Sequence, residues 1–389
     1  MNEPLQILLV EDSDFDATVL VSFLSNAGVD FNHTRVWDRS TFEDALEKSS
    51  PDLIIADHEL PEFNGMDAFR IAKANKKNIP FILVTGTVSE NILTEYAKEG
   101  VDDYPLKNNL LRLPSAIEHL LNKRKIEDLN KQLEIAQREI RASINCAKRI
   151  QNSMLSNTQI FKRVFAKSFG LFRPKDILSG DFYWLKQEEE SFFIAVADCT
   201  GHGIPGALMS MIGIEKLNTL VLQTKEPDEI LTLLHQSIEE TLGQSALHEH
   251  SCEGMDIVLC SVDKKNRSLK FSGANRPLWI IRNSTGELEE IRGTKRGIGG
   301  FTSGLNPEFV CHEISLQPDD TFYLTSDGYA DQFGGPLRRK ITTEKFKQTL
   351  VDIQDQPMAQ QEAHLANYFD DWKNGADQVD DMLVVGVRV

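Results

Sequence analysis

The stretch from residue 117 to residue 157 limits the fold of this chain more than any other feature, because it contains neither glycine nor proline. Nothing in it stops a helix, so we expect a helical segment between an N-terminal part, residues 1–122, and a C-terminal part, residues 161–389. In heptads counted from Ile126, eight of the nine a and d positions are apolar. These positions are Ile126, Leu129, Leu133, Ala136, Ile140, Ser143, Ala147, Ile150 and Met154. The pattern predicts a coiled coil over residues 123–160 that joins two copies of the chain; the alternative is a single helix packed on its own domain.

The N-terminal part alternates short apolar runs with amphipathic stretches. The apolar runs span Ile7–Val10, Leu53–Ala56 and Phe81–Val84, and the stretches between them include Phe15–Leu24 and Met66–Ala74. Strands that alternate with helices predict an α/β domain built on a doubly wound parallel sheet.

Acidic residues mark the ends of the first and third predicted strands. Glu11 and Asp12 follow the first strand, and Asp57 ends the third. Because ligands of open parallel sheets bind at the carboxyl ends of the strands, we expect these carboxylates to meet there. A hard dication such as Mg2+ relieves their repulsion, and Asp57 can then attack phosphorus to form an acyl phosphate.

Two later residues complete this pattern. Thr85 follows the run Phe81–Val84, where its hydroxyl can hydrogen-bond a phosphoryl oxygen, and Lys107 can pair with the phosphoryl charge. Pro61 and Gly65 stand four and eight residues after Asp57.

With these residues in this order, residues 5–122 resemble the receiver domain of two-component response regulators. The resemblance implies a phosphoacceptor, Asp57, that binds Mg2+ together with Glu11 and Asp12. It implies a switch formed by Thr85, Tyr104 and Lys107, and a histidine kinase or phosphotransfer protein as phosphoryl donor. The residue after the lysine, a proline in the family, is Asn108 here, which puts the last loop of the pocket in doubt.

The C-terminal part mixes strands with a few long helices, which favours sheets flanked by helices in an α+β domain. The predicted strands are Ser191–Ala197, Asp256–Val262, Leu269–Ser272, Leu278–Arg282, Thr321–Thr325 and Met382–Val389. The predicted helices are Gly206–Gln223, Pro227–Gly243 and Met358–Trp372.

Four aspartates stand at strand margins or before an aromatic run in this part: Asp181, Asp198, Asp327 and Asp380. A carboxylate cluster without matching cations requires metal ions, and oxygen ligands select Mg2+ or Mn2+. Two such ions that share an aspartate can activate a water for attack on phosphorus. No cysteine is followed by arginine six positions later, which argues against a phosphatase with a cysteine nucleophile.

Glycines surround the second of these aspartates. Gly201, Gly203 and Gly206 allow tight backbone turns beside a metal site and before the following helix. His202, between the first two, either donates a proton to the leaving group or orients the loop.

Residues 170–389 resemble the SpoIIE-like branch of the PPM (type 2C) protein phosphatases, and further motifs carry the likeness. They are Phe271–Leu278, Gly297–Gly299 and Asp331–Gly335. The resemblance implies an α-β-β-α sandwich that hydrolyses phosphoserine or phosphothreonine on proteins, often on STAS-domain antagonists of anti-sigma factors. It implies two Mn2+ or Mg2+ ions, one held by Asp181, Asp198 and the backbone carbonyl of Cys199, the other by Asp198, Asp327 and Asp380.

The sequence departs from that family at several positions. The first glycine of its Gly-Gly-Asp is Ser179 here, and its acid three residues after the aspartate is Trp184. Asp381 occupies a position that is Asp or Asn in the family. The phosphate-binding arginine of eukaryotic members has only Arg173 and Lys175 as candidates.

Net charge and composition disfavour two classes of partner, nucleic acid and membrane. The net charge of −17 disfavours non-specific binding to nucleic acid, and no apolar run reaches the length of a membrane span, so we expect a cytoplasmic protein. The segment His248–Cys252 is interpreted as a solvated loop rather than a metal site. A phosphorylation-dependent binding module without hydrolysis remains the alternative to an enzyme. A transcription factor is disfavoured, because no helix-turn-helix follows the helical segment.

Overall fold

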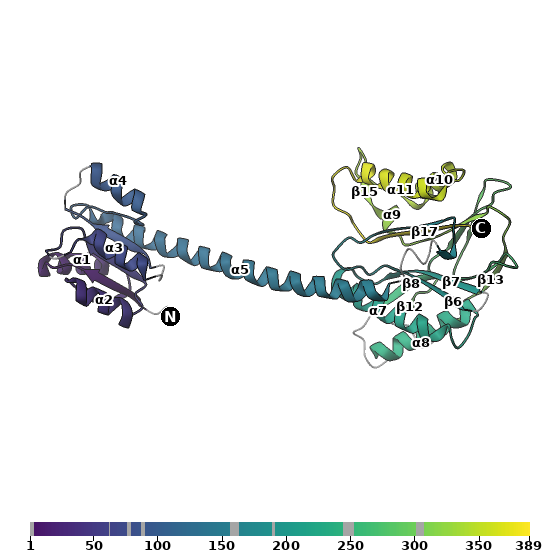
Figure 1. Cartoon of the computed structure of the whole chain (residues 1–389), viewed down its shortest axis with the longest axis horizontal. Helices are drawn as coiled ribbons and strands as arrows, with labels where there is room; N and C mark the ends of the chain where they lie inside the picture. The colour runs from purple at the N-terminus through teal and green to yellow at the C-terminus, as the bar shows by residue number, and fades with distance from the viewer. Residues whose placement is uncertain are drawn as a thin grey trace. The chain divides into compact units, whose positions relative to one another are not determined.

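The computed structural model describes residues 4–61, 63–75, 79–86, 90–155, 163–188, 191–243, 253–300 and 307–389. The chain divides into two compact units, residues 1–138 and 139–389. Figure 1 labels the helices and strands of both. Within the described residues, no helix combines the length and the apolar character that crossing a bilayer would need.

The first unit is built on a parallel sheet with strand order β2-β1-β3-β4. Its strands are β1 (Leu5–Val10), β2 (Phe31–Val36), β3 (Leu53–Asp57) and β4 (Phe81–Val84). Single parallel bridges continue the pairing beyond β4, from Ile82 to Asp103 and from Thr85 to Leu106. The predicted doubly wound α/β fold is confirmed.

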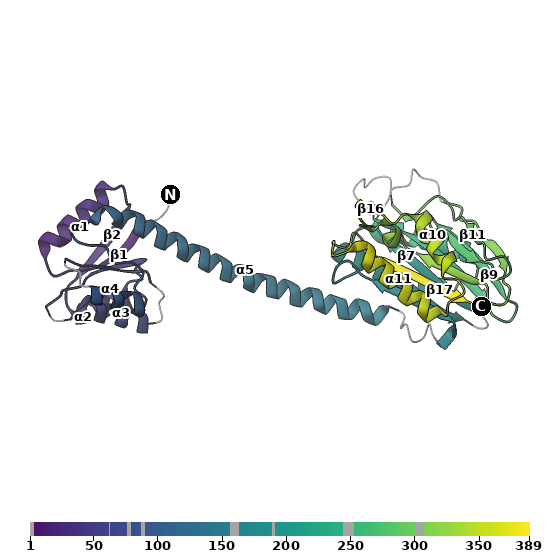
Figure 2. The ribbon, with the colours of Figure 1, turned by 90° about the horizontal axis from the view of Figure 1, so that it is seen from above.

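Helices cover both faces of this sheet, because each carries an apolar stripe that the central strands bury. One core joins the sheet to α1 and the start of α5, and the other joins it to α2, α3 and α4. Figure 2 shows α1 and α5 on one side of the strands and the other helices opposite. The helices are α1 (Asp14–Asn26), α2 (Arg39–Lys48), α3 (Gly65–Ala74), α4 (Glu90–Glu99) and α5 (Leu113–Met154).

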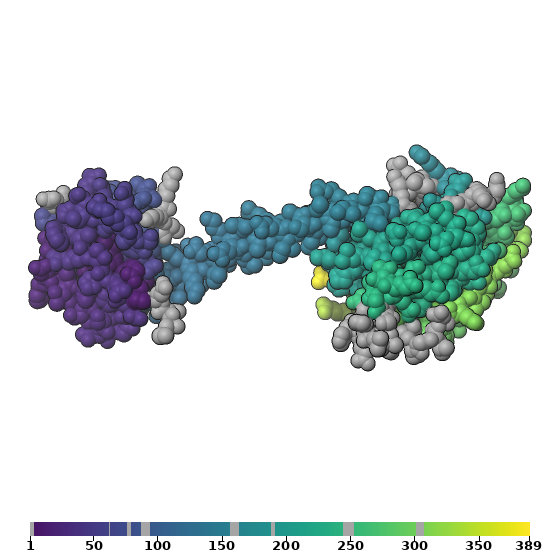
Figure 3. Space-filling model, turned by 90° about the horizontal axis from the view of Figure 1, so that it is seen from below, coloured from purple at the N-terminus to yellow at the C-terminus, as the bar shows by residue number. Residues whose placement is uncertain are grey.

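Helix α5 runs without interruption over 42 residues, as the absence of glycine and proline from residue 117 onward predicts. Figure 3 draws the surface of this helix from one side. The apolar side chains of Ile126, Leu133 and Ile140 are 59%, 56% and 61% exposed. Packing of this stripe on its own domain, the alternative to a coiled coil, is therefore wrong for this stretch within the described residues.

The second unit contains two antiparallel sheets. One has the strand order β11-β10-β14-β17-β5, and the other has β13-β9-β8-β7-β6 with β12 beside β8. The strands of the first are β5 (Ser168–Arg173), β10 (Leu278–Ile281), β11 (Leu288–Ile291), β14 (Thr321–Thr325) and β17 (Met382–Arg388). The strands of the second are β6 (Phe182–Glu188), β7 (Ser191–Cys199), β8 (Gly254–Asp263), β9 (Ser268–Ala274), β12 (Ile298–Gly299) and β13 (His312–Ser315).

Helices cover the outer face of each sheet, which gives the predicted α-β-β-α sandwich (Figures 1 and 2). A central core lies between the sheets, a second joins β6–β8 to α7 and α8, and a third joins the other sheet to α9, α10 and α11. These helices are α7 (Gly203–Leu220), α8 (Pro227–Leu242), α9 (Gly328–Asp331), α10 (Thr343–Asp352) and α11 (Met358–Lys373). A two-residue hairpin, β15 (Phe333–Gly334) with β16 (Arg339–Lys340), completes the elements.

Several elements escaped prediction from sequence. Strand β2 is largely polar and exposed, so it shows no apolar run. Strands β11 and β13 are short and only partly buried at sheet edges, and α10 is a mostly polar helix. Helix α7 begins at Gly203, three residues before the predicted start, because the glycine loop itself turns into the helix.

Two candidate functional sites

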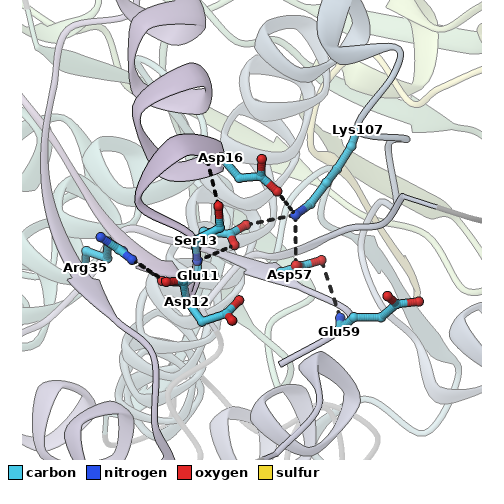
Figure 4. Close-up of polar contacts among 8 residues, drawn as sticks. All are labelled: Glu11, Asp12, Ser13, Asp16, Arg35, Asp57, Glu59 and Lys107. Atoms are coloured by element: carbon cyan, nitrogen blue, oxygen red, sulfur yellow. Dashed lines mark hydrogen bonds and ion pairs between the residues drawn. The ribbon is translucent and has the colours of Figure 1, made fainter. Parts of the chain in front are cut away.

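The first site lies where the parallel strands of the first unit end. Glu11 and Asp12 follow β1, and Asp57 is the last residue of β3. Ligand atoms from these three side chains all lie within 4.8 Å of one another. Glu11 and Asp57 are buried, whereas Asp12 is exposed. The expected meeting of the three carboxylates is thus present, and it is shown in Figure 4.

One lysine, Lys107, partly neutralises the charge of these carboxylates. The Nζ atom of Lys107 lies 2.8 Å from Asp57 Oδ2 and 3.2 Å from Glu11 Oε2. It also lies 2.5 Å from Asp16 Oδ2, a contact from α1 that sequence reasoning missed (Figure 4). Burial lowers the pKa of Lys107, but its bonds to Asp16 and Asp57 outweigh burial and raise it. The lysine therefore stays charged beside Asp57.

The cluster retains an excess of negative charge that suits a divalent cation. Burial raises the pKa of Glu11, a hydrogen bond from the Ser13 amide lowers it, and the charge of Asp57 raises it again. One lysine faces four carboxylates, counting Asp16 with the three at the strand ends. These residues therefore fit Mg2+, which prefers carboxylate oxygens.

The remaining switch residues flank this cluster. Thr85 is buried, and its backbone is tied to Lys107 by a hydrogen bond from the Lys107 amide to the Thr85 carbonyl, 2.8 Å long. Tyr104 is half-buried, with its ring centroid 5.7 Å from that of Tyr96. Both positions allow the roles that the receiver resemblance implies.

The second site gathers the four aspartates of the C-terminal part at one edge of the sandwich. Asp198 lies near the end of β7, and Asp181 directly precedes β6. Asp327 caps α9 after β14, and Asp380 stands shortly before β17. The charges of these residues act on one another: Asp198 raises the pKa of Asp181, and Asp327 and Asp380 raise that of Asp198.

Burial makes this crowding costly. The pKa of Asp181 is raised well above its ordinary value, first by burial and then by Asp198, although a hydrogen bond from Ser326 lowers it. Its buried Oδ2 atom has no hydrogen-bond partner among the described residues. Burial also dominates at Asp198, whose pKa rises to about 7. Closely spaced carboxylates with an unpartnered buried oxygen fit divalent ions.

An arginine also stands in this cluster, which corrects the expectation of carboxylates without matching cations. Arg276 Nη2 contacts Asp198 Oδ2 and lies 2.9 Å from Asp327 Oδ2. Its Nε atom lies 3.9 Å from Asp256 Oδ2, so a further acid, from β8, borders the site. Sequence reasoning included Arg276 only as part of the motif Phe271–Leu278. Its charge inside that family-like motif was the available signal.

The two basic residues proposed from sequence for phosphate binding differ in their distance from the aspartates. Arg173 Nη1 donates to Asp370 Oδ1 on α11 at 2.7 Å, so its guanidinium is engaged away from the aspartates. Lys175 is nearer: burial and Asp327 raise the pKa of Asp380, and the charge of Lys175 lowers it. In this structure Arg173 therefore pairs with α11 and contacts none of the four aspartates among the contacts of the described residues.

Asp381 positions the loop that carries Asp181. Its Oδ1 accepts a hydrogen bond from the Lys175 amide at 2.7 Å, and its Oδ2 accepts one from the Gly180 amide, also at 2.7 Å. A Cβ atom on Gly180 would lie 2.6 Å from the Gly201 carbonyl oxygen. Only glycine therefore lets this loop approach the loop after β7 so closely.

His202 lies at the start of α7, with its ring half-exposed. The Nδ1 atom is 2.8 Å from Asp176 Oδ2 in the preceding loop. This pair links the glycine loop to the segment that leads to Asp181, so the loop-orienting alternative has a direct contact in its favour. Trp184, in place of the family's acid, is buried and donates its Nε1 hydrogen to Asn218 Oδ1 at 3.0 Å.

A buried glutamine connects α5 to this site. Gln151 Nε2 donates to the Ser179 carbonyl at 2.6 Å and to Ser210 Oγ on α7 at 3.0 Å. Ser179 begins the loop of Asp181, and Ser210 lies in the helix that follows the glycine loop. The last turns of α5 are therefore fastened to the loop that carries Asp181 and to α7.

A cavity of about 270 Å³ opens beside Asp198. It is bordered by Asp198, Thr200, Gly254, Met255, Asp256, Arg276, Gly297, Ile298, Gly299, Gly300 and Asp327. The segment His248–Cys252, predicted to be a solvated loop, lies outside the described residues.

Comparisons with known proteins match both halves of the chain. Residues 188–389 match the family model of stage II sporulation protein E (SpoIIE), and residues 7–118 match that of the response regulator receiver domain. Among solved structures, the SiaA-PP2C domain of Pseudomonas aeruginosa superposes with a TM-score of 0.58 at 29% identity, over 65% of this chain and 98% of that one.

Two curated relatives come from Bacillus subtilis (strain 168). Phosphoserine phosphatase RsbP is 21% identical over 226 residues, which are 57% of this chain and 54% of that protein. Phosphoserine phosphatase RsbU is 32% identical over 110 residues, which are 28% of this chain and 32% of that protein. The chain thus spans about half of the first relative and a third of the second.

Proposed function

The chain belongs to the SpoIIE family and carries a response regulator receiver domain, and from that premise we propose that it is a metal-dependent phosphoserine/phosphothreonine protein phosphatase controlled by phosphorylation of Asp57. The observation that carries the proposal is the cluster of Asp181, Asp198, Asp327 and Asp380, in which Asp181 is buried and Asp198 and Asp327 are half-buried. Divalent ions would relieve the raised pKa values of Asp181, Asp198 and Asp380 and would give the unpartnered Asp181 oxygen a ligand.

Each aspartate has a proposed part in holding two Mn2+ or Mg2+ ions. Asp198 is shared by both, Asp181 and the Cys199 carbonyl complete one site, and Asp327 and Asp380 complete the other. When bound, the ions supply a nucleophilic water and neutralise charge on the phosphoryl group. Asp381 keeps the Asp181 loop in place through the Gly180 amide, so that the first site has a fixed geometry.

The receiver half supplies the control. Asp57 is proposed to accept a phosphoryl group from a histidine kinase or phosphotransfer protein, with Mg2+ held by Asp57, Glu11 and Asp12. Lys107 lies 2.8 Å from Asp57 and is placed to pair with the added charge. The Thr85 carbonyl accepts a hydrogen bond from the Lys107 amide, and we propose that Thr85 senses the phosphoryl group on Asp57.

The substrate is proposed to be a phosphorylated anti-sigma factor antagonist of the STAS type. The support is the resemblance to the SpoIIE-like branch together with the names of two relatives, both of which are phosphoserine phosphatases. A phosphorylated STAS protein should lose its phosphate faster than an unrelated phosphoprotein at equal concentration.

Helix α5 is proposed to join two copies of the chain and to carry the signal. The exposed apolar stripe of Ile126, Leu133 and Ile140 supports pairing, since a second copy would cover it. Leu133→Asp with Ile140→Asp would place charges in that seam, which is costly. Light scattering should report a halved mass for this variant, and an unchanged mass would contradict the coil.

The main experiment measures hydrolysis by the full chain with and without Mn2+. p-Nitrophenyl phosphate and a phosphoserine protein serve as substrates, and EDTA as the control. We expect turnover that depends on the metal and changes after treatment with beryllium fluoride. Metal-independent turnover, or none with either substrate, would refute the phosphatase.

One observation favours a second function, a phosphorylation-dependent binding module with weak catalysis. Arg276 already neutralises Asp198 and Asp327, and a permanent ion pair there would exclude metal ions from both. In that case, the chain would bind its phosphorylated partner in a pull-down assay but release no phosphate.

A further inference from the structure

The turn that carries Arg276 is fixed at the edge of the phosphatase cluster. It lies in the turn between β9 and β10, next to Asn275, whose backbone has a positive φ of 58°. Asn275 Nδ2 donates to Asp256 Oδ1 at 2.8 Å and fixes the turn to β8. Only 14% of the Arg276 side chain is exposed, so the guanidinium cannot simply turn out to solvent.

The contacts of Arg276 use the oxygens that the metal ions would need. Its Nη2 atom contacts Asp198, which both ions are proposed to share, and Asp327, which belongs to one of them. A guanidinium on these carboxylates opposes the binding of a divalent ion to them, because the two cations repel each other. Arg276 and the ions therefore compete for the same anions.

A guanidinium displaced by the ions needs another anion within reach. Its Nε atom is buried and has no hydrogen-bond partner among the described residues, although Asp256 lies 3.9 Å away. Among the described residues that border the 270 Å³ cavity, Arg276 is the one cation. The planar guanidinium matches phosphate oxygens by paired hydrogen bonds. The anion that comes to this cavity during the reaction is the phosphoryl group of the substrate.

We propose that Arg276 is a substrate-binding residue held in reserve, which pairs with Asp198 and Asp327 until metal ions displace it and then binds the phosphoryl group of the substrate. This inference rests on the proposed function. It gives the site a phosphate ligand from the turn between β9 and β10, in place of Arg173, which is engaged with Asp370. It also removes the objection that a permanent ion pair blocks catalysis.

The exchange predicts two effects of opposite sign. Loss of the guanidinium frees the carboxylates, so metal ions should bind more tightly. The same loss removes a phosphate ligand, so phosphate should bind more weakly. A residue that only supports the fold would weaken both.

The test uses the full chain with Arg276→Met and Arg276→Lys, and with Arg292→Met as a control. Arg292 is an exposed arginine of the same domain that pairs with Glu290. Calorimetry without substrate measures Mn2+ affinity, and inhibition by inorganic phosphate at saturating Mn2+ measures phosphate affinity. For Arg276→Met we expect Mn2+ to bind about tenfold more tightly and phosphate at least about tenfold more weakly. Arg276→Lys should fall between, and Arg292→Met should match the wild type.

Each other outcome overturns the inference or its premise. Mn2+ affinity that is unchanged or weaker in Arg276→Met refutes the competition, and unchanged phosphate affinity refutes the role in substrate binding. Should Arg276→Met fail to fold, Arg276→Lys decides by the same two measurements. A wild-type protein that binds no Mn2+ would refute the proposed function, whereas Mn2+ binding that ignores both substitutions would refute this inference alone.

Discussion

In the receiver half, one lysine reaches three carboxylates, whereas in the phosphatase half one arginine reaches two half-buried carboxylates beside the buried Asp181. Lys107 contacts Glu11, Asp16 and Asp57 from a strand end, and Asp57 is 6% exposed beside the exposed Asp12. Arg276 contacts Asp198 and Asp327 and leaves a buried oxygen of Asp181 without a partner among the described residues.

The difference matches the chemistry proposed for each half. In the receiver, a side chain of the protein receives the phosphoryl group, so a lysine that stays beside Asp57 is useful before and after transfer. In the phosphatase half, no protein nucleophile is proposed, and the acids would serve only to hold ions. A cation there must be able to leave, which an arginine pairing with the substrate phosphate can do.

Asp57→Ala tests the receiver half alone and should have the largest effect. Without the carboxylate, no acyl phosphate can form, so modification by acetyl phosphate should disappear while basal phosphatase turnover persists. Mass spectrometry of the intact chain measures the modification. Asp44→Ala, an exposed acid of the same domain paired with Lys48, is the control. Equal modification of wild type and Asp57→Ala would place the phosphoacceptor elsewhere.

Asp198→Asn tests the phosphatase half. It removes the charge that two ions are proposed to share, so Mn2+-dependent turnover should fall at least about a hundredfold. Beryllium fluoride should still bind the receiver, as fluorine NMR can report. Asp331→Asn, which breaks only a surface pair with Lys340, should retain turnover. Persistent activity in Asp198→Asn would contradict the proposal that Asp198 is shared by two catalytic ions.

Insertions near Gln137 test whether α5 couples the halves. Seven added residues preserve the heptad face, so turnover should still respond to beryllium fluoride. Four added residues rotate the face as a stutter does, and turnover should become fixed at a high or a low value. The ratio of rates with and without beryllium fluoride measures the coupling. An unchanged ratio in both variants would show that α5 only connects the two halves and does not carry the signal.

Gln151→Leu should have the smallest effect. Its loss leaves the Ser179 carbonyl and Ser210 Oγ without their donor, which costs about 1–3 kcal/mol of unfolding free energy. Because Ser179 begins the Asp181 loop, turnover should also fall, by about tenfold. Denaturant titration and initial rates measure the two. Asn152→Leu, at the exposed neighbouring position, is the control. A stability loss without a rate loss would assign Gln151 to packing only.

Much of the architecture follows from local sequence. The apolar runs that end just before Glu11, Asp57 and Thr85 predicted that these side chains lie at one edge of the sheet, because the carboxyl ends of parallel strands share that edge. The absence of glycine and proline predicted an unbroken α5. The margins of β7, β14 and β17 placed three of the four phosphatase aspartates. These features depend on periodicity and on residues adjacent in the chain.

The partners of those residues were decided only by tertiary structure. Asp16 reaches Lys107 across 91 positions, Arg276 reaches Asp198 across 78, and the Gly180 amide reaches Asp381 across 201. Hydrophobic pattern gives the face of a strand or helix, but it does not say which distant side chain fills the space beside a charge. A buried carboxylate needs a cation or a hydrogen-bond donor beside it, and the packing of the two sheets determined which residue supplies that partner.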